Sequence, residues 1–201
     1  MPVLDLANGY YELPQGKLAN VVTCLEMKAR PARALVQFPP ELSLQRMGVD
    51  DLEAHRALFR AVGQDLMWFS RLIMPDEKLA GILGNPSIET YALVQGGAQI
   101  GLLELNFAEA PDCELAFFGL VPSAIGDGVG RALMDEAIRR AWAKPIQRFW
   151  VHTCTFDSPQ ALPFYVRSGF TPYARMIEVH DDPRLLGKLA RTASPQVPLL
   201  D

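Results

Sequence analysis

The chain has 201 residues, of which 49% are hydrophobic and 21% charged, and this suits one domain with a sizeable core. The formal net charge of −4 argues against nucleic acid and against an anionic membrane surface as the main partner. No apolar run could span a bilayer and the first residues lack the pattern of a signal peptide, so we expect a cytoplasmic protein.

Residues 1–40 are predicted to form an N-terminal extension, because the segment is too short to build a core of its own. Its first 17 residues are typical of a loosely structured arm. Residues 18–27, LANVVTCLEM, have β-branched residues at their centre and predict one strand. Three prolines within residues 30–40 indicate a linker to the following domain.

Residues 41–180 carry alternating helix and strand patterns, which predict a mixed α/β domain. A strand is followed by three helices, then by three strands joined through turns as an antiparallel meander. A glycine-rich turn, a helix, a strand, a helix that Ser158 caps and a last strand complete the domain. Residues 181–201 are predicted to be a tail whose end is mobile. We place the strands at residues 42–47, 88–95, 99–107, 113–121, 147–155 and 172–179, and the helices at residues 51–62, 65–73, 75–83, 129–143 and 158–167.

The stretch ELAFFGLVPSAIGDGVGRAL, residues 114–133, joins a buried strand to a helix through three glycines within five residues. Glycines let the backbone approach a ligand, and the helix start adds free N–H groups and a partial positive charge. Together they predict an anion site, usually for phosphate, although the glycines alone fit a plain turn equally well. A P-loop is excluded because no lysine is present, and the dinucleotide fingerprint would need glycine in place of Arg131.

A second motif, ALPFYVRSGF at residues 161–170, follows the glycine loop after one helix and one strand. In this order the two motifs resemble those of the GNAT superfamily of N-acetyltransferases, which read Gln/Arg-x-x-Gly-x-Gly/Ala and Ala-x-x-φ-Tyr-x-x-x-Gly-Phe. The resemblance covers about residues 42–179. The loop departs from the family pattern at Ile125, which replaces Gln or Arg, and at Asp127, which puts a carboxylate beside the expected pyrophosphate.

The resemblance implies a GNAT-like central mixed, mostly antiparallel sheet of six or seven strands flanked by helices. Two neighbouring strands would splay apart around acetyl-coenzyme A (acetyl-CoA). The implied reaction is direct attack of a primary amine, on an unidentified small-molecule or peptide acceptor, upon the acetyl group. The alternative is a non-catalytic module that binds or senses acyl-CoA, and a homodimer is possible. The residues implied to bind the cofactor are Leu120, Val121, Ile125, Gly126, Asp127, Gly128, Val129, Gly130, Arg131, Ser158 and Phe164.

Two residues are the main catalytic candidates. Glu114 lies eleven positions before Ile125, the spacing of the catalytic glutamate in histone-type members, and a carboxylate there could take the amine proton. Glu104 in the preceding strand is the rival base. Tyr165 matches the tyrosine of the second motif, which the resemblance makes the general acid for the departing thiolate.

The acceptor pocket is predicted from two other segments. Trp68 and Arg71 lie in the helix where family members often build this pocket, and Arg71 would suit a carboxylate on the acceptor. His152 lies in the strand that should border the acyl group and could assist proton transfer.

Cysteine and histidine residues are few in this chain. Three widely spaced cysteines favour free thiols in a reducing compartment over a disulfide framework. No histidine stands at metal-ligand spacing from another histidine or cysteine, so we expect no metal. The residues concerned are Cys24, Cys113, Cys154, His55, His152 and His180.

Overall fold

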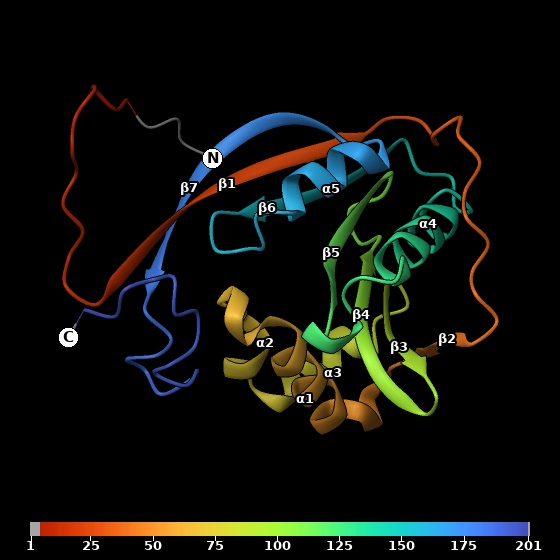
Figure 1. The fold of residues 1–201 in the computed structure, drawn as a ribbon, viewed down its shortest axis with the longest axis horizontal. Coiled ribbons are helices and arrows are strands. Elements are labelled where there is room, and N and C mark those ends of the chain that lie inside the picture. Colours follow the sequence, from red (N-terminus) through yellow and green to blue (C-terminus); the bar gives the residue numbers. More distant parts are fainter. Residues whose placement is uncertain (1–4, 201) are drawn as a thin grey trace.

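The computed structural model describes residues 5–200, and within them seven strands form one mixed sheet (Figure 1). The strands are β1 (Lys17–Met27), β2 (Leu42–Arg46), β3 (Ile88–Gln95), β4 (Ala98–Asn106), β5 (Asp112–Leu120), β6 (Arg148–Cys154) and β7 (Thr171–Asp181). Their spatial order is β2-β3-β4-β5-β6-β1-β7, and every neighbouring pair is antiparallel except β5 and β6. The predicted mixed, mostly antiparallel sheet is confirmed.

Helices cover both faces of the sheet (Figure 1). On one face, α1 (Leu52–Gly63) buries Leu58, Phe59 and Val62 against β3 and β4, a spacing that puts all three side chains on one side of a helix. The helices α2 (Ser70–Ile73) and α3 (Asp76–Leu83) lie beside it, whereas α4 (Val129–Ala141) and α5 (Ala161–Ser168) cover the other face. No helix among residues 5–200 has the length and apolar character to cross a membrane.

The predicted meander is present as β3, β4 and β5. Gly96 and Gly97 join β3 to β4 with φ values of 57° and 83°, which is the backbone that a tight hairpin turn requires. The next turn leads into β5, whose end is followed by the glycine loop and α4. The meander therefore carries the chain directly to the predicted anion site.

β1 lies inside the sheet, between β6 and β7. Val22 pairs with Cys154 of β6 on one side and with Met176 of β7 on the other. The sequence pattern identified this strand but placed it in an extension before the domain. The boundary predicted at residue 40 therefore separates two parts of one sheet.

β5 and β6 run side by side for only a short distance. Their parallel pairing extends from Asp112 opposite Arg148 to Glu114 opposite Trp150, and beyond that point β5 continues to Leu120 without β6 beside it. Divergence at this position is what the family resemblance implied. It opens the sheet between the two strands.

The proline-containing linker between β1 and β2 is fixed against α4. Arg33 donates a hydrogen bond of 2.9 Å to the buried Asp135, and the backbone N–H of Val36 donates another of 2.8 Å to the same carboxylate. An ion pair of this burial depends on both partners. Asp135 therefore ties the linker to the helix that follows the glycine loop.

The helix predicted at residues 65–73 is divided in two. A short 3-10 helix (Gln64–Leu66) ends at Met67, which has a left-handed φ of 58°, and α2 begins at Ser70. Met67 is buried against Phe156 and Leu189. Packing against the C-terminal tail therefore accompanies a break that the helical sequence pattern could not indicate.

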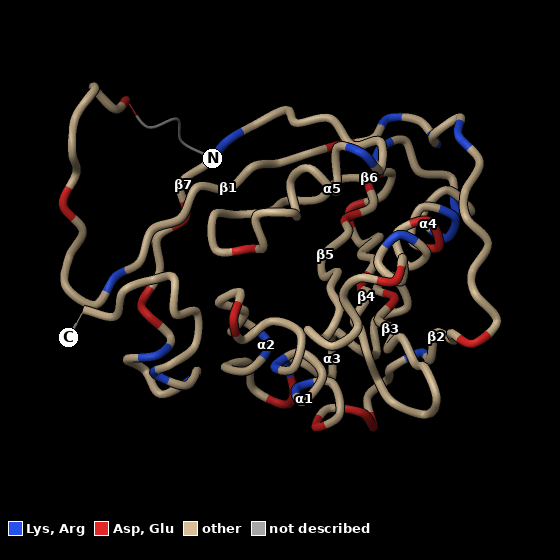
Figure 2. The backbone as a smooth tube through the Cα atoms, viewed as in Figure 1, with Lys and Arg blue, Asp and Glu red and all other residues tan. Residues whose placement is uncertain are grey.

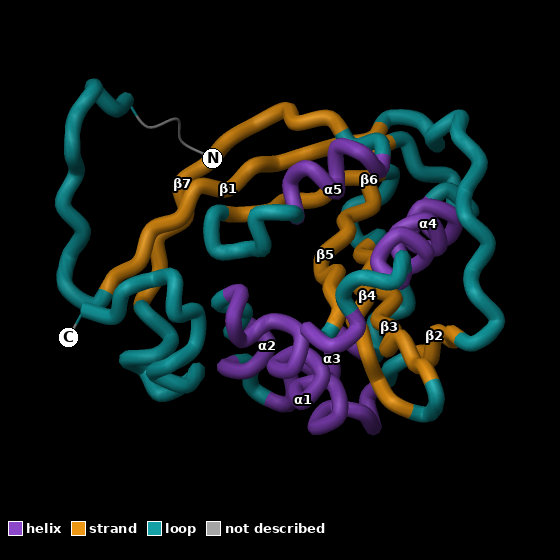
Figure 3. Tube along the Cα trace, in the orientation of Figure 1, coloured by secondary structure: helices purple, strands orange, loops and turns teal. Residues whose placement is uncertain are grey.

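Part of the C-terminal tail packs against the domain, because Leu189 and Ala193 are buried in one cluster with Met67 and Phe156. Mobility of the end of the tail stays a prediction. Figure 3 shows the segment after β7 as loop throughout. Arg184, which is 3% exposed, pairs with Asp182 at 2.7 Å and donates to the carbonyls of Ala193 and Val197 at 3.2 and 2.7 Å. These bonds hold the loop in a folded shape without regular secondary structure.

Candidate active site

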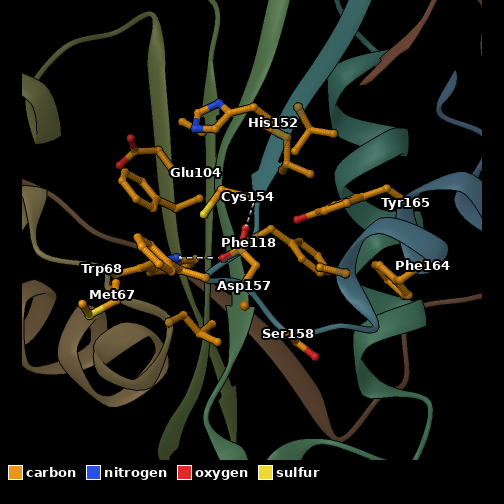
Figure 4. A pocket seen from close by; sticks show the side chains of 18 of the residues that line it. Met67, Trp68, Glu104, Phe118, His152, Cys154, Asp157, Ser158, Phe164 and Tyr165 are labelled. Carbon is orange, nitrogen blue, oxygen red and sulfur yellow. Dashed lines mark hydrogen bonds between the residues drawn. The ribbon is translucent and has the colours of Figure 1, made fainter. Parts of the chain in front are cut away.

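A cavity of about 580 Å³ opens where β5 and β6 diverge. Figure 4 shows side chains from both strands, from α5 and from the segment around Trp68 pointing into it. Several of the residues predicted to bind substrates line this cavity. They are Trp68, Arg71, Leu120, Ile125, Gly130, His152, Ser158 and Phe164, together with Glu104, Glu114 and Tyr165.

The glycine loop has the geometry of an anion site. Gly126 and Gly128 have φ values of 136° and 80°, and a Cβ atom at either position would meet nothing within 4 Å. The loop thus needs glycine for its backbone and leaves open space above it. Five backbone N–H groups of the loop and of the start of α4 donate to no acceptor within residues 5–200. They are those of Gly126, Asp127, Val129, Gly130 and Arg131.

The remaining loop positions lie around this backbone. Ile125 is 70% exposed, and Asp127 is exposed as well, without a cationic partner within ion-pair distance in the described chain. Arg131 lies one turn before Asp135 and contacts it at 3.4 Å. Gly126, Asp127, Gly128 and Arg131 do not line the cavity, nor do Val121 and Val129, which pack against the cores instead.

α5 begins later than the sequence pattern predicted. Its first residue is Ala161, and Ser158 lies in the preceding turn, where its Oγ accepts a hydrogen bond of 3.3 Å from the Gln160 N–H. Ser158 is therefore not the N-cap of this helix. The predicted stop is present, because Gly169 closes α5 with a left-handed φ of 113°.

Tyr165 presents its hydroxyl to the cavity from α5 (Figure 4). The residue is 7% exposed, and its ring packs edge-on against Phe118, Phe164 and Phe170. Burial raises the pKa of the phenol well above its ordinary value, and the nearby Asp157 carboxylate acts in the same direction. The hydroxyl therefore keeps its proton throughout the neutral range, as a proton donor must.

Glu114 is the last residue of β5 that pairs with β6, just before these two strands diverge. Burial raises the pKa of its carboxyl group, and the neighbouring His152 opposes that effect. The Nδ1 atom of His152 is 3.7 Å from the Glu114 carboxylate. A carboxylate with a raised pKa is a stronger proton acceptor than an exposed one.

Glu104, the rival base, is committed to protein partners. Arg71 pairs with one oxygen at 2.6 Å and the hydroxyl of Thr90 donates to the other at 2.9 Å, while Glu104 itself is 1% exposed. The guanidinium of Arg71 also lies over the ring of Phe117. An acceptor carboxylate would have to compete with this ion pair for Arg71, and a substrate proton would have to displace it from Glu104.

Asp157 is a polar centre of the cavity that the sequence did not indicate. It accepts hydrogen bonds from the Thr153 hydroxyl at 2.7 Å, the Cys154 N–H at 2.9 Å and the Trp68 indole at 3.4 Å. Figure 4 shows its bonds to Trp68 and to the end of β6. Asp157 therefore links the two walls of the cavity, a relation that no local sequence pattern carries.

Two further polar residues line the cavity from β1 and β7. Asn20 of β1 stands opposite Glu178 of β7, and its Nδ2 donates a hydrogen bond of 3.0 Å to the glutamate. The sequence interpretation missed Asn20 because it left β1 outside the domain, and it missed Glu178 because the pairing of β7 with β1 was not predicted.

Comparison with known proteins gives a family match. The model of the Acetyltransferase (GNAT) family matches residues 53–170. No curated protein matches the chain.

Solved structures share the fold at low sequence identity. A GCN5-related N-acetyltransferase from Sphaerobacter thermophilus aligns with a TM-score of 0.57 and 12% identity over 81% of this chain, which spans about half (52%) of that protein. The PaiA N-acetyltransferase from Thermoplasma acidophilum, in complex with coenzyme A, aligns with a TM-score of 0.52 and 20% identity over 70% of this chain and 98% of its own. An aminoglycoside acetyltransferase from an uncultured soil metagenomic sample, in complex with sisomicin, aligns with a TM-score of 0.52 and 17% identity over 64% of this chain and 88% of its own.

Proposed function

The chain belongs to the GNAT family of acetyltransferases, and on that premise we propose that it transfers the acetyl group of acetyl-CoA to a primary amine. The observation that carries this proposal is that a proton acceptor and a proton donor line the same cavity. Glu114, with a raised pKa, and Tyr165, with a protonated phenol, both line the cavity where β5 and β6 diverge.

The glycine loop supports binding of the pyrophosphate of acetyl-CoA. Unpaired amides and the N-terminus of α4 together favour a phosphate anion. Arg167 of α5 lines the same cavity, is exposed, and has no carboxylate at ion-pair distance within the described residues. It is available for a further phosphate group.

Glu114 is proposed to accept the proton that the attacking nitrogen loses as its bond to the acetyl carbon forms. Most amines are protonated at neutral pH and cannot attack in that state. The partly buried carboxylate of Glu114, which lines the cavity, removes this proton directly or through a water molecule. His152 contacts Glu114 and lines the cavity beside it.

Tyr165 is proposed to complete the transfer by protonating the leaving group. When the carbon–sulfur bond breaks, the sulfur carries the electron pair and needs a proton. The phenol supplies that proton. Its raised pKa keeps it protonated until the thiolate, itself a base, leaves.

Turnover is tested by incubating the protein with acetyl-CoA and a panel of amines while free coenzyme A is measured. We expect release with at least one amine. Tyr165→Phe keeps the ring packing and removes the donor, so kcat should fall ~100-fold or more with little change in acetyl-CoA affinity. Tyr173→Phe, at a tyrosine on β7 that is 46% exposed, is the matched control and should retain full activity.

Two results would contradict the proposal. Full kcat in Tyr165→Phe would show that another group protonates the sulfur. Tight binding of acetyl-CoA without release across the whole amine panel would favour the non-catalytic sensing module.

A further inference from the structure

The cavity carries more acidic than basic charge. Figure 2 shows Lys and Arg interspersed with Asp and Glu over the chain as a whole. Of the cavity's two arginines, Arg71 is already paired with Glu104. Neither Glu114 nor Glu178 has a Lys or Arg at ion-pair distance among residues 5–200. Asp157 also lacks such a cation, but it accepts three hydrogen bonds from protein donors. Glu114 and Glu178 are therefore the cavity carboxylates that a cationic ligand could approach.

Asn20 adds an independent sign of a missing partner next to Glu178. The residue is 3% exposed and lines the cavity, yet its Oδ1 atom has no hydrogen-bond partner in the described structure. The amide cannot be turned to exchange its atoms, because Oδ1 would then face the Glu178 carboxylate that Nδ2 now contacts. A buried carbonyl oxygen without a donor is costly, and a bound ammonium group would supply that donor.

The strand register separates this pair from the catalytic carboxylate. Glu114 stands opposite Trp150, whereas Asn20 lies two residues beyond Val22, the partner of Cys154. Six residues of strand correspond to roughly 20 Å of backbone. The distance between the two carboxylates is shorter where their side chains extend toward each other. The two acidic positions thus lie toward opposite ends of the acceptor part of the cavity.

Between these two positions the cavity has an apolar patch, beside the polar side chains of His152 and Asp157. Cys154, Phe156, Met67 and Phe69 all line the cavity. Met67 and Phe156 belong to one buried cluster, against which Phe69 and Cys154 pack. An acidic end, an apolar stretch and a second acidic end match an ammonium, a methylene chain and a second ammonium.

We propose that Asn20 and Glu178 form a subsite for a second ammonium group, and that the acceptor is an aliphatic diamine or polyamine. This inference rests on the proposed function for the identity of the reacting end. One nitrogen loses its proton to Glu114 and is acetylated, while the distal nitrogen stays charged and donates hydrogen bonds to Asn20 Oδ1 and Glu178. The methylene chain lies on the apolar patch.

The acceptor class is tested by comparing butylamine, 1,4-diaminobutane, spermidine and sisomicin as acceptors under the same conditions. The KM for spermidine should be ~10- to 100-fold lower than that for butylamine, because a charged hydrogen bond is gained. Sisomicin, a polyhydroxylated cation, should be the poorer polycationic acceptor. Equal KM values for butylamine and spermidine would overturn the subsite.

The subsite residues are tested by Glu178→Gln and Asn20→Leu. Each should raise the KM for spermidine ~10-fold or more and leave the KM for butylamine unchanged. Asp181→Asn removes the same charge from the same strand, at a residue that pairs with Lys17 and does not line the cavity. It should change neither value, and a KM increase equal to that of Glu178→Gln would show a long-range charge effect and contradict the subsite.

Calorimetry with spermidine separates this inference from the proposed function. If no amine is acetylated, spermidine binding that Glu178→Gln weakens would still support the subsite while the proposed function fails. Absence of spermidine binding to the unmutated protein, with a thermal midpoint showing that it is folded, would overturn the subsite whatever the activity.

Discussion

At the scale of single residues, two carboxylates on adjacent strands of one cavity have opposite surroundings. Glu104 is held by Arg71 and Thr90 and is almost fully buried. Glu114 has a partly exposed histidine and the side chain of Asn106 beside it, and no Lys or Arg at ion-pair distance within the described residues. The first arrangement stabilises an ion pair, and the second leaves a carboxylate whose charge is poorly compensated.

The raised pKa of Glu114 predicts the pH dependence of activity and stability. Because a raised pKa favours the protonated form, the active carboxylate appears only as the pH rises through that value, and the acidic limb of kcat/KM should lie above the ordinary range of glutamate. Glu114→Gln should lower kcat/KM by ~10²–10⁴-fold and abolish the limb. A kcat/KM profile measured from pH 4 to 9 checks this.

Glu114→Gln should lower activity but raise the stability of the folded state at neutral pH. The raised pKa means that the folded state loses stability as Glu114 ionises with rising pH, so Glu114→Gln should raise the thermal midpoint at neutral pH but not at acidic pH. Glu104→Gln is the contrasting variant, since it leaves Arg71 without its partner and should lower the thermal midpoint. An acidic limb that disappears in Glu104→Gln and persists in Glu114→Gln would reverse the assignment of the base.

Only part of this site could be predicted from sequence. Glu114 and Tyr165 stand at fixed distances from recognisable motifs, so their positions could be predicted. Asp157, Asn20 and Glu178 enter the cavity through pairings between distant strands and loops. Local patterns do not encode those pairings.

At the scale of elements, the glycine loop is the feature whose backbone follows most directly from residue type. Gly126 and Gly128 adopt φ values that other residues rarely adopt. In contrast, the predicted helix at residues 65–73 failed because Met67 turns left-handed where it packs against the tail. Residue propensity predicted the backbone where glycine requires it, and tertiary packing overrode propensity elsewhere.

Substitution at the loop tests the anion site. Gly128→Glu should weaken acetyl-CoA binding at least ~10-fold, because a side chain and a negative charge would enter the space over the free amides. Gly97→Glu is a matched control, since Gly97 also has a positive φ of 83° and open space around it but lies in the β3–β4 turn. Titration calorimetry of both folded variants checks this, and equal affinities would exclude the loop as the phosphate site.

At the scale of the whole molecule, β1 connects two parts of the sheet. β7 is an edge strand that pairs with β1, and β1 pairs on its other side with β6. Sequence patterns predicted that β1 exists, but its partners lie more than a hundred residues away in the chain. Pairing at such separation depends on the assembled sheet and not on local propensity.

Truncation tests this role of β1. A chain begun at Pro14 retains the whole strand and should melt cooperatively, within a few degrees of the full chain. A chain begun at Lys28 lacks β1, leaves β7 without a neighbour and removes Val22, Leu25 and Met27 from the core, so it should show no cooperative transition. Circular dichroism melts of both chains check this, and a cooperative melt of the shorter one would show that the strand is dispensable.

The position of β1 also sets an order of events during synthesis. The meander of β3, β4 and β5 joins neighbours in sequence and can form as soon as it leaves the ribosome. β1 is synthesised before any of them, but it cannot pair until β6 and β7, the last strands to be synthesised, have emerged. Closure of so long a loop is slow. We therefore expect the nascent chain to carry an exposed apolar strand for most of its translation, and late insertion of that strand to limit the rate of folding.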